Sequence, residues 1–317
     1  MRLPRRRRER DCRCRLRWRD DARSDRGMHP RRIELRKLPP GHRPDARRDE
    51  PGYTGGCGMN DFPAGMVWLV GAGPGDPELL TRKAERLIGR ASVVFFDALV
   101  GREVLDLASP GARLVDVGKR SGRHSKDQRT IDALIVEAAL SGERVVRLKG
   151  GDPSIFGRAT EELEACRSAG VVVAVCPGVT AASAAAAGLS RSLTLRGLAR
   201  KLVFVTAHAR AGDTLDLDWA ALADPGATLA IYMGKSAAGA IARGLQGTGM
   251  AGETPVALVE NASLPDERRI VTRLDLLELA ARTLGDGPAL LLIGEAMRTP
   301  GRRAVAAAAQ AMERETP

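Results

Sequence analysis

Short apolar runs alternate with segments of helical periodicity from residue 67 onward, and this alternation predicts the fold class. The runs have the length and the β-branched content of buried strands. They lie at 67–70, 92–96, 113–117, 144–148, 171–175, 201–205, 228–233, 255–260, 269–272 and 289–294. Strands separated by helices in this way predict an α/β fold, with mostly parallel sheet in the first half of the chain.

Apolar residues recur at helical spacing between these runs. The predicted helices cover 77–89, 127–141, 159–168, 179–188, 236–246 and 274–284. Asp76 precedes Pro77, a residue favoured at the first helical position, so we expect Asp76 to cap the first helix. Ser125 stands three residues before Gln128, which is the spacing of a capping box, so we expect Ser125 to cap the second.

The pattern also predicts how the chain divides. The strands at 255–260 and 269–272 follow each other closely across a turn containing Pro-Asp, which predicts an antiparallel, hairpin-like pair. We place a domain boundary near Pro177-Gly178. The predicted parts are a disordered, Arg-rich tail over 1–64, an N-terminal α/β domain over 65–177, a C-terminal α/β domain over 178–300 and a C-terminal tail over 301–317.

Charge is distributed unevenly along the chain. The net charge of +11 is typical of a nucleic-acid binder. However, residues 1–58 hold 19 Lys and Arg against 9 Asp and Glu, whereas the remainder holds 31 against 30. The tail has no hydrophobic period, which predicts disorder. Two interpretations of it stay open: a nucleic-acid or anion-binding arm, or upstream DNA read as protein with the true start at Met59 or Met66.

Composition excludes several classes of protein for the body of the chain. No cluster of His, Cys and Asp has metal-ligand spacing, so we expect no catalytic metal. Cys166 and Cys176 show no such spacing either, and we expect no disulfide framework and a reduced, cytoplasmic compartment. No run reaches 18 apolar residues without charges, so no membrane partner is expected. Aromatic residues make up only 3%, which argues against base-stacking platforms and a nucleic-acid partner.

Unusual short motifs follow nearly every predicted strand. They are GAGPGD at 71–76, Asp97, GKR at 118–120, GGD at 150–152, PGVT at 177–180, TAH at 206–208, MGK at 233–235 and EN at 260–261. Ligands of open α/β sheets bind outside the carboxyl ends of the strands. We therefore expect these motifs to converge on one cleft.

The first motif is a glycine-rich loop whose spacing differs from the dinucleotide fingerprint G-x-G-x-x-G. Its glycines allow the backbone to come close to a ligand, and Pro74 fixes the turn. The spacing disfavours a nicotinamide dehydrogenase, although Asp97 stands where a ribose-binding acid would be expected.

Two later loops supply polar chemistry. Gly150 and Gly151 expose backbone groups, and Asp152 can accept hydrogen bonds from hydroxyl or amine groups of a small molecule. The loop at 118–125 is strongly basic and suits a polycarboxylate or a phosphate.

Taken together, GAGPGD, FFDALV, VGKRSGRH, VRLKGGDPSIFGR, PGVTAA, YMG and PVALVEN occur in this order over residues 67–297. This set resembles the tetrapyrrole methylase family. The resemblance implies two α/β domains with the active site in the cleft between them, in a homodimer. It implies S-adenosylmethionine as cofactor and a tetrapyrrole as small-molecule substrate. The implied reaction is C-methylation of uroporphyrinogen III at ring positions 2 and 7, giving precorrin-2 through precorrin-1 and S-adenosylhomocysteine, for sirohaem or cobalamin biosynthesis.

The resemblance also implies site residues. Asp97 matches the proton acceptor and Lys119 the proton donor. The positions that match cofactor contacts are Pro74, Gly150, Gly151, Asp152, Ile155, Thr180, Ala181, Met233 and Ala262. Candidate partners for the substrate carboxylates, chosen on charge alone, are Arg120, Arg123, Arg147 and Arg196, with Arg129 and Arg191 as further possibilities.

Two alternatives to this function remain. One is a sister methylase that acts on a later corrin intermediate, which the loops at 117–124 and 147–158 argue against. The other is an RNA-directed protein that uses the arginine-rich tail, and its only support is the charge of that tail.

Overall fold

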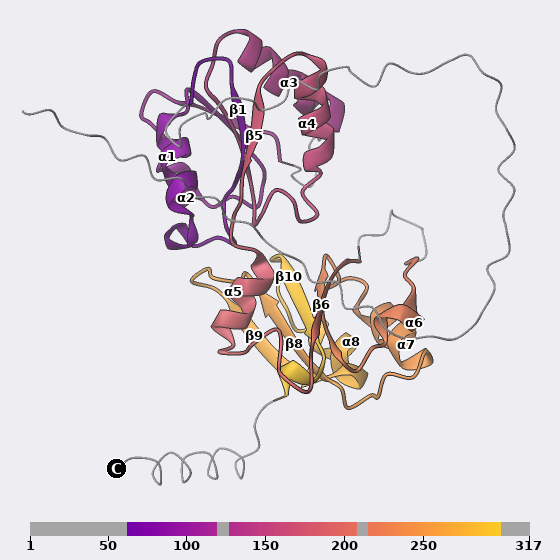
Figure 1. The fold of residues 1–317 in the computed structure, drawn as a ribbon. Coiled ribbons are helices and arrows are strands. Elements are labelled where there is room, and N and C mark those ends of the chain that lie inside the picture. The colour runs from indigo at the N-terminus through magenta and orange to yellow at the C-terminus, as the bar shows by residue number, and fades with distance from the viewer. Residues whose placement is uncertain (1–61, 119–126, 208–214, 299–317) are drawn as a thin grey trace, which may run out of the picture. The chain divides into compact units, whose positions relative to one another are not determined.

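The computed structural model describes residues 62–118, 127–207 and 215–298. The predicted N-terminal tail lies outside these residues except at 62–64, and the C-terminal tail lies outside them entirely. Within the described ranges the chain forms two five-stranded sheets that carry helices on their faces (Figure 1). The prediction of an α/β fold is therefore confirmed.

The first sheet is entirely parallel and has the strand order β3-β2-β4-β1-β5. Its strands are β1 (Val67–Gly71), β2 (Val93–Phe96), β3 (Arg113–Asp116), β4 (Val145–Lys149) and β5 (Val173–Cys176). The helices α1 (Arg82–Arg90) and α2 (Arg102–Leu105) cover one face, and α3 (Gln128–Leu140) and α4 (Ala159–Ser168) cover the other (Figure 1). Parallel strands need such crossover helices, so both faces are buried.

The second sheet is mixed and has the strand order β6-β7-β10-β8-β9. Its strands are β6 (Lys201–Thr206), β7 (Ala227–Tyr232), β8 (Pro255–Glu260), β9 (Arg268–Arg273) and β10 (Ala289–Ile293). β6 runs parallel to β7, whereas β10 is antiparallel to both β7 and β8. β8 and β9 form the predicted antiparallel pair. α5 (Ala181–Gly188) packs on one face, and α7 (Ala238–Gly247) and α8 (Leu277–Ala281) pack on the other.

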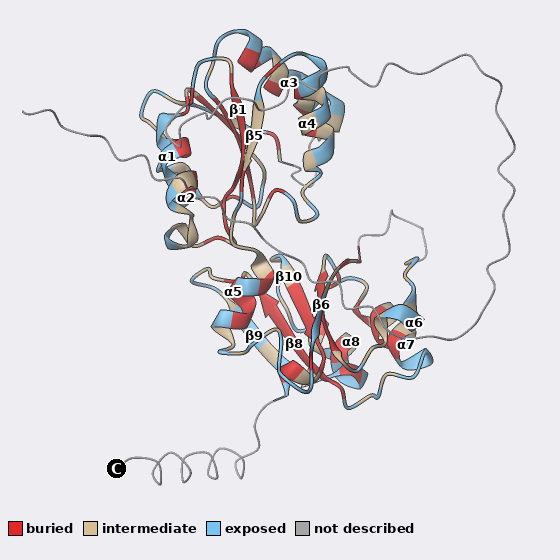
Figure 2. Cartoon of the chain, in the orientation of Figure 1, coloured by how far each residue is buried: buried red, intermediate tan, exposed pale blue. Residues whose placement is uncertain are grey.

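Burial follows strand position in each sheet (Figure 2). Every residue of the central strands β1, β4 and β8 is buried, whereas the edge strands β3 and β9 are largely exposed. The alanine-rich segment forms α5, as predicted, and its small side chains pack directly against the second sheet. Among the described residues, none of the helices combines the length and the apolar character needed to cross a membrane.

One helix start differs from the prediction. α3 begins at Gln128, but its N-cap is Asp127 and not Ser125. The Asp127 carboxylate accepts a hydrogen bond of 2.7 Å from the Thr130 amide, and this bond is the main reason why the pKa of Asp127 is lowered. Gln128 does not reach back as a capping box requires, because its amide donates to Asp132. An aspartate next to the helix supplied the cap, and Ser125 itself lies outside the described residues.

Other element boundaries differ in detail. Asp76 does cap a helix at Pro77, but that helix is a single 3₁₀ turn, η1 (Pro77–Leu79). A second cap, Thr81, then begins α1. The segment at 274–284 likewise opens with a 3₁₀ turn, η2 (Leu274–Leu276), and η3 (Glu295–Met297) follows β10. Two four-residue helices, α2 and α6 (Trp219–Leu222), were not predicted, because one turn is too short to show a period.

We expect Leu258→Ala to destabilise the protein by about 2–5 kcal/mol, because Leu258 is fully buried in the central strand β8 and truncation leaves a cavity. Leu279→Ala is the matched control, since that side chain is 64% exposed. Urea unfolding measures both. Equal midpoints for the two variants would mean that β8 does not form the core.

Candidate active site

The loops that follow β1, β4 and β5 are locked together by their backbones. Gly73 and Gly151 exchange two backbone hydrogen bonds, with N···O distances of 3.2 and 2.6 Å. A Cβ atom on Gly178 would lie 2.2 Å from the Gly151 carbonyl oxygen and 2.9 Å from the Gly71 Cα. These contacts leave no room for a side chain at Gly71 or Gly178, whereas Gly151 is favoured by its φ of +68°.

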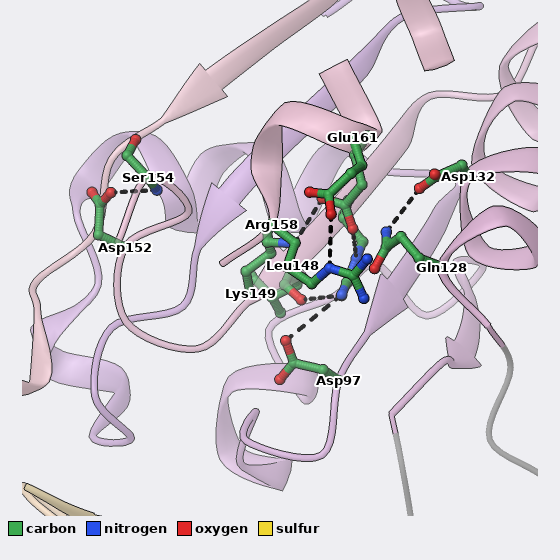
Figure 3. Close-up of polar contacts among 11 residues, drawn as sticks. Asp97, Gln128, Asp132, Leu148, Lys149, Asp152, Ser154, Arg158 and Glu161 are labelled. Carbon is green, nitrogen blue, oxygen red and sulfur yellow. Dashed lines mark hydrogen bonds and ion pairs between the residues drawn. The ribbon is translucent and has the colours of Figure 1, made fainter. Parts of the chain in front are cut away.

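Asp152 fastens two of these loops to each other. Its Oδ1 accepts from the Ser154 amide at 2.7 Å, and its Oδ2 accepts from the Gly178 amide at 2.9 Å (Figure 3 shows the first contact). Each carboxylate oxygen can accept a further hydrogen bond. Asp152 therefore holds the loops in place and keeps acceptor capacity for a ligand.

Space for a ligand lies beside Gly151. Its φ is +68°, and nothing lies within 4 Å of the position that a Cβ would occupy. Gly150, in contrast, packs closely on Leu99, whose side chain is 59% exposed. The GGD loop thus presents bare backbone next to an exposed apolar side chain.

Residues of β7 and of the loop after β8 contact the loops after β1 and β4. The Asp76 amide donates to Ser263 Oγ at 3.1 Å, and the Phe156 and Tyr232 rings lie 5.2 Å apart between centroids. The Tyr232 hydroxyl accepts from the Ala182 amide at 3.3 Å. Burial raises the pKa of Tyr232, so its hydroxyl stays protonated at neutral pH.

These contacts bring further predicted positions near the glycine loops. Met233 follows Tyr232 directly, with φ of 55° and 47% exposure, and Ala262 precedes Ser263 and is buried. Thr180 caps α5 by accepting from the Ser183 amide, and Ala181 is the first residue of that helix. Pro74 and Ile155 are half-buried within the loops after β1 and β4.

Asp97 follows β2 and belongs to a cluster of charged side chains (Figure 3). Its Oδ1 accepts from the Leu99 amide at 3.0 Å. Its Oδ2 lies 3.7 Å from Arg147 Nη2, and its side chain is 26% exposed. Asp97 is therefore oriented by the chain while remaining open to solvent.

Glu162 lies at the centre of this cluster and is fully buried. Its Oε1 accepts from Arg147 Nε at 2.9 Å, and its Oε2 accepts from Lys149 Nζ at 2.7 Å. Arg147 Nη1 also donates to the Leu148 carbonyl at 2.8 Å. Burial lowers the pKa of Lys149, the nearby Arg147 charge lowers it further, and Glu162 opposes both.

The basic candidates fall into three groups. Lys119, Arg120 and Arg123 lie outside the described residues, as does His124. Arg147 is buried and directed at Glu162 and Asp97, so the structure gives it an internal role instead of the expected one toward substrate carboxylates. Arg196 is exposed.

Glu162 and the Phe156–Tyr232 contact were not predicted from the sequence. A signal for Glu162 did exist, because Arg147 and Lys149 are two cations on the same face of a buried strand. Such a pair needs an anion from the covering helix. In the part of the chain that the structure describes, no group of three His, Cys, Asp or Glu is arranged to hold a metal ion.

The chain is an α/β protein with two sheets, and the interlocked glycine loops lie at the carboxyl ends of the parallel strands of the first sheet, where open α/β sheets generally bind small molecules. Residues 66–278 match the family model of the Tetrapyrrole (Corrin/Porphyrin) Methylases. Because this match spans more than half of the chain, the chain belongs to the tetrapyrrole methylase family.

Three relatives place the chain within that family. It is 49% identical over 231 residues to the uroporphyrinogen-III C-methyltransferase of Paracoccus denitrificans, and the matched region covers 73% of this chain and 80% of the relative. It is 46% identical over 235 residues to the siroheme synthase of Gluconacetobacter diazotrophicus, covering 74% of this chain but only 50% of that longer protein. Among solved structures, the uroporphyrin-III C-methyl transferase from Thermus thermophilus in complex with S-adenyl homocysteine matches with a TM-score of 0.62 and 42% identity. The match covers 73% of this chain and 98% of that structure's chain.

We expect Gly178→Ala to lower the free energy of unfolding by about 1–3 kcal/mol, because the new Cβ overlaps the Gly151 carbonyl and forces the loops apart. Gly111→Ala is the control, since that exposed glycine has nothing within 4 Å of its Cβ position. Thermal unfolding monitored by circular dichroism compares them. A Gly178→Ala protein as stable as the control would show that the loops are not interlocked in solution.

Proposed function

We propose that this chain is an S-adenosylmethionine-dependent methyltransferase that methylates uroporphyrinogen III at ring positions 2 and 7, giving precorrin-2 and S-adenosylhomocysteine. The observation that carries the proposal is the set of interlocked glycine loops beside Asp97, in a chain 49% identical to a uroporphyrinogen-III C-methyltransferase. The similarity to a siroheme synthase supports a place in sirohaem biosynthesis, with cobalamin biosynthesis as the other use of the same product.

The residues present fit this cofactor. A polar cofactor with an adenine ring and a methionine chain needs bare backbone, a few acceptors and apolar side chains. The open side of Gly151, the acceptor capacity of Asp152 and the exposed Met233 supply these three features. We propose that it is held by Pro74, Gly150, Gly151, Asp152, Ile155, Thr180, Ala181, Met233 and Ala262. When bound, it supplies an electrophilic methyl group on a sulfonium centre.

The chain itself has two tasks in such a reaction. It must place the pyrrole carbon in line with the methyl group, since placement can supply much of the rate. It must also accept the proton that the methylated ring loses when conjugation is restored. We assign the second task to Asp97, because its carboxylate is oriented by the Leu99 amide and is open to solvent. Lys119, outside the described residues, is the proposed proton donor.

Substrate binding falls to cations that are free to reach a tetrapyrrole with eight carboxylates. We propose Arg196, which is exposed, together with Arg120 and Arg123 from the loop outside the described residues. Arginine suits this task because its guanidinium can bind a carboxylate through two hydrogen bonds.

We further propose a homodimer and a cytoplasmic location. Leu195 and Leu198 are exposed just before β6, an edge strand of the second sheet, and Leu202 is exposed within it. Grouped exposed leucines favour association. The location is supported by Cys166 and Cys176, which are free and buried, because unpaired buried cysteines are usual in a reducing compartment.

We expect light scattering to give twice the mass of one chain, and Leu198→Glu to shift that mass toward one chain by placing charge in the interface. Leu140→Glu is the control, since Leu140 is 67% exposed at the end of α3. A single-chain mass for the unmodified protein would rule out the homodimer.

We expect Asp97→Asn to reduce methyl transfer about 100-fold or more while S-adenosylhomocysteine still binds, because the amide keeps the shape but cannot accept the proton. The assay is anaerobic, with uroporphyrinogen III and methyl-labelled S-adenosylmethionine, and two labels per tetrapyrrole are expected from the unmodified chain. Asp106→Asn, at an exposed aspartate after α2, is the control.

The result separates the parts of the proposal. Cofactor binding without label transfer by the unmodified protein would leave the methyltransferase class but reject the substrate. Absence of S-adenosylhomocysteine binding by calorimetry would reject the class as well.

A further inference from the structure

Buried charge on β4 is unusual for this sheet. The neighbouring strands β1 and β2 contain only apolar residues and glycine, whereas β4 places Arg147 and Lys149 two residues apart and therefore on one face. Their side chains are 6% and 4% exposed. Only one carboxylate of the covering helix α4, that of Glu162, meets both cations in the described structure.

Stability alone does not explain this arrangement. Two charges in an apolar interior must be desolvated, and replacing a buried ion pair by packed apolar side chains is often neutral or stabilising. The strand and the helix that carry these charges, β4 and α4, also contribute Val145 and Cys166 to an apolar cluster with Phe95 and Ile135, so apolar residues at the charged positions would suit this face of the sheet. The cost of the charges therefore points to a role outside packing.

The register of the sheet shows where that role lies. β2 pairs in parallel with β4, with Phe95 opposite Arg147, so Asp97 projects from the same face as Arg147 and Lys149. Arg147 spans the two carboxylates: its Nε donates to the fully buried Glu162, and its Nη2 faces Asp97. The buried carboxylate of Glu162 thus holds the Nε edge of the Arg147 guanidinium, and the Nη2 end of the same group faces Asp97, the proposed proton acceptor.

We propose that Glu162 is a positioning residue for methyl transfer, which acts by holding Arg147 so that its guanidinium fixes the orientation of Asp97. This inference rests on the proposed function, because it assumes that Asp97 accepts a proton there. Lys149 balances the cluster: two cations, Arg147 and Lys149, face two carboxylates, Glu162 and Asp97. Without Glu162, both cations would turn to Asp97.

The test compares Glu162→Gln with Glu161→Gln. Glu161 is next along α4, but its exposed carboxylate pairs with Arg158 at the surface. For Glu162→Gln we expect kcat to fall about 10- to 100-fold, as misplacement of a reacting group does, with KM for uroporphyrinogen III and the Kd for S-adenosylhomocysteine within about twofold of the control. A Glu162→Gln protein with the kcat of the control would overturn the proposal.

A double variant separates positioning from charge balance. Glu162→Gln with Lys149→Met removes one anion and one cation, so we expect it to regain thermal stability relative to Glu162→Gln while kcat stays low. Recovery of kcat together with stability would show that Glu162 only neutralises charge, and would overturn the proposal. If the single variant does not fold, the double variant decides by the same criterion.

The outcome is distinguishable from failure of the proposed function. That failure appears in the unmodified chain, as absence of label transfer to uroporphyrinogen III. The inference fails when the unmodified chain transfers label and either Glu162→Gln or the double variant, once folded, does so at the kcat of the control.

Discussion

The contact of Gly178 with Gly151 and Gly71 is the constraint on which the site depends. β1 lies between β4 and β5 in the sheet, so their three following loops emerge side by side. At that spacing the loops can pass only backbone against backbone, and the paired hydrogen bonds of Gly73 and Gly151 fix their register. Everything else at this end of the sheet, from the Asp152 contacts to the exposed Leu99, is arranged around that junction.

The cluster of charged side chains around Glu162 is a second constraint, and it lies on the face of the sheet that α3 and α4 cover. β4 contributes to both constraints, because its last residues carry the cations and its following loop carries the two glycines. A shift of β4 by one position would exchange its two faces, moving Arg147 and Lys149 away from Glu162 and displacing the GGD loop at once. The charged cluster and the glycine junction are thereby coupled through a single strand.

Sequence reasoning recovered what depends on local pattern. All ten predicted strands form, because runs such as VWLV and ALLLI record burial directly in their composition. The cap at Asp76 was predictable since it depends on neighbouring residues alone. Asp127 replaced Ser125 because several acceptors near a helix start compete, and only the backbone geometry selects one.

Contacts between distant residues were harder to predict. The Phe156–Tyr232 contact spans 76 positions of the sequence and the Asp76–Ser263 contact spans 187 positions. No local period encodes contacts over such separations. The charge pattern of β4 marked Arg147 as a candidate but could not show that its partner is internal.

The close packing of the glycine loops also bears on how this protein could be altered. Main-chain atoms at Gly71, Gly151 and Gly178 cannot be exchanged by mutation, and a larger residue at Gly71 or Gly178 collides with its neighbours. Libraries that randomise these two positions would mostly yield destabilised chains. Exposed side chains around the loops, such as Leu99, Phe156 and Met233, are free of that restriction. Altered ligand preference should therefore be sought, by selection or design, at these exposed side chains, while the glycines at 71, 151 and 178 are kept.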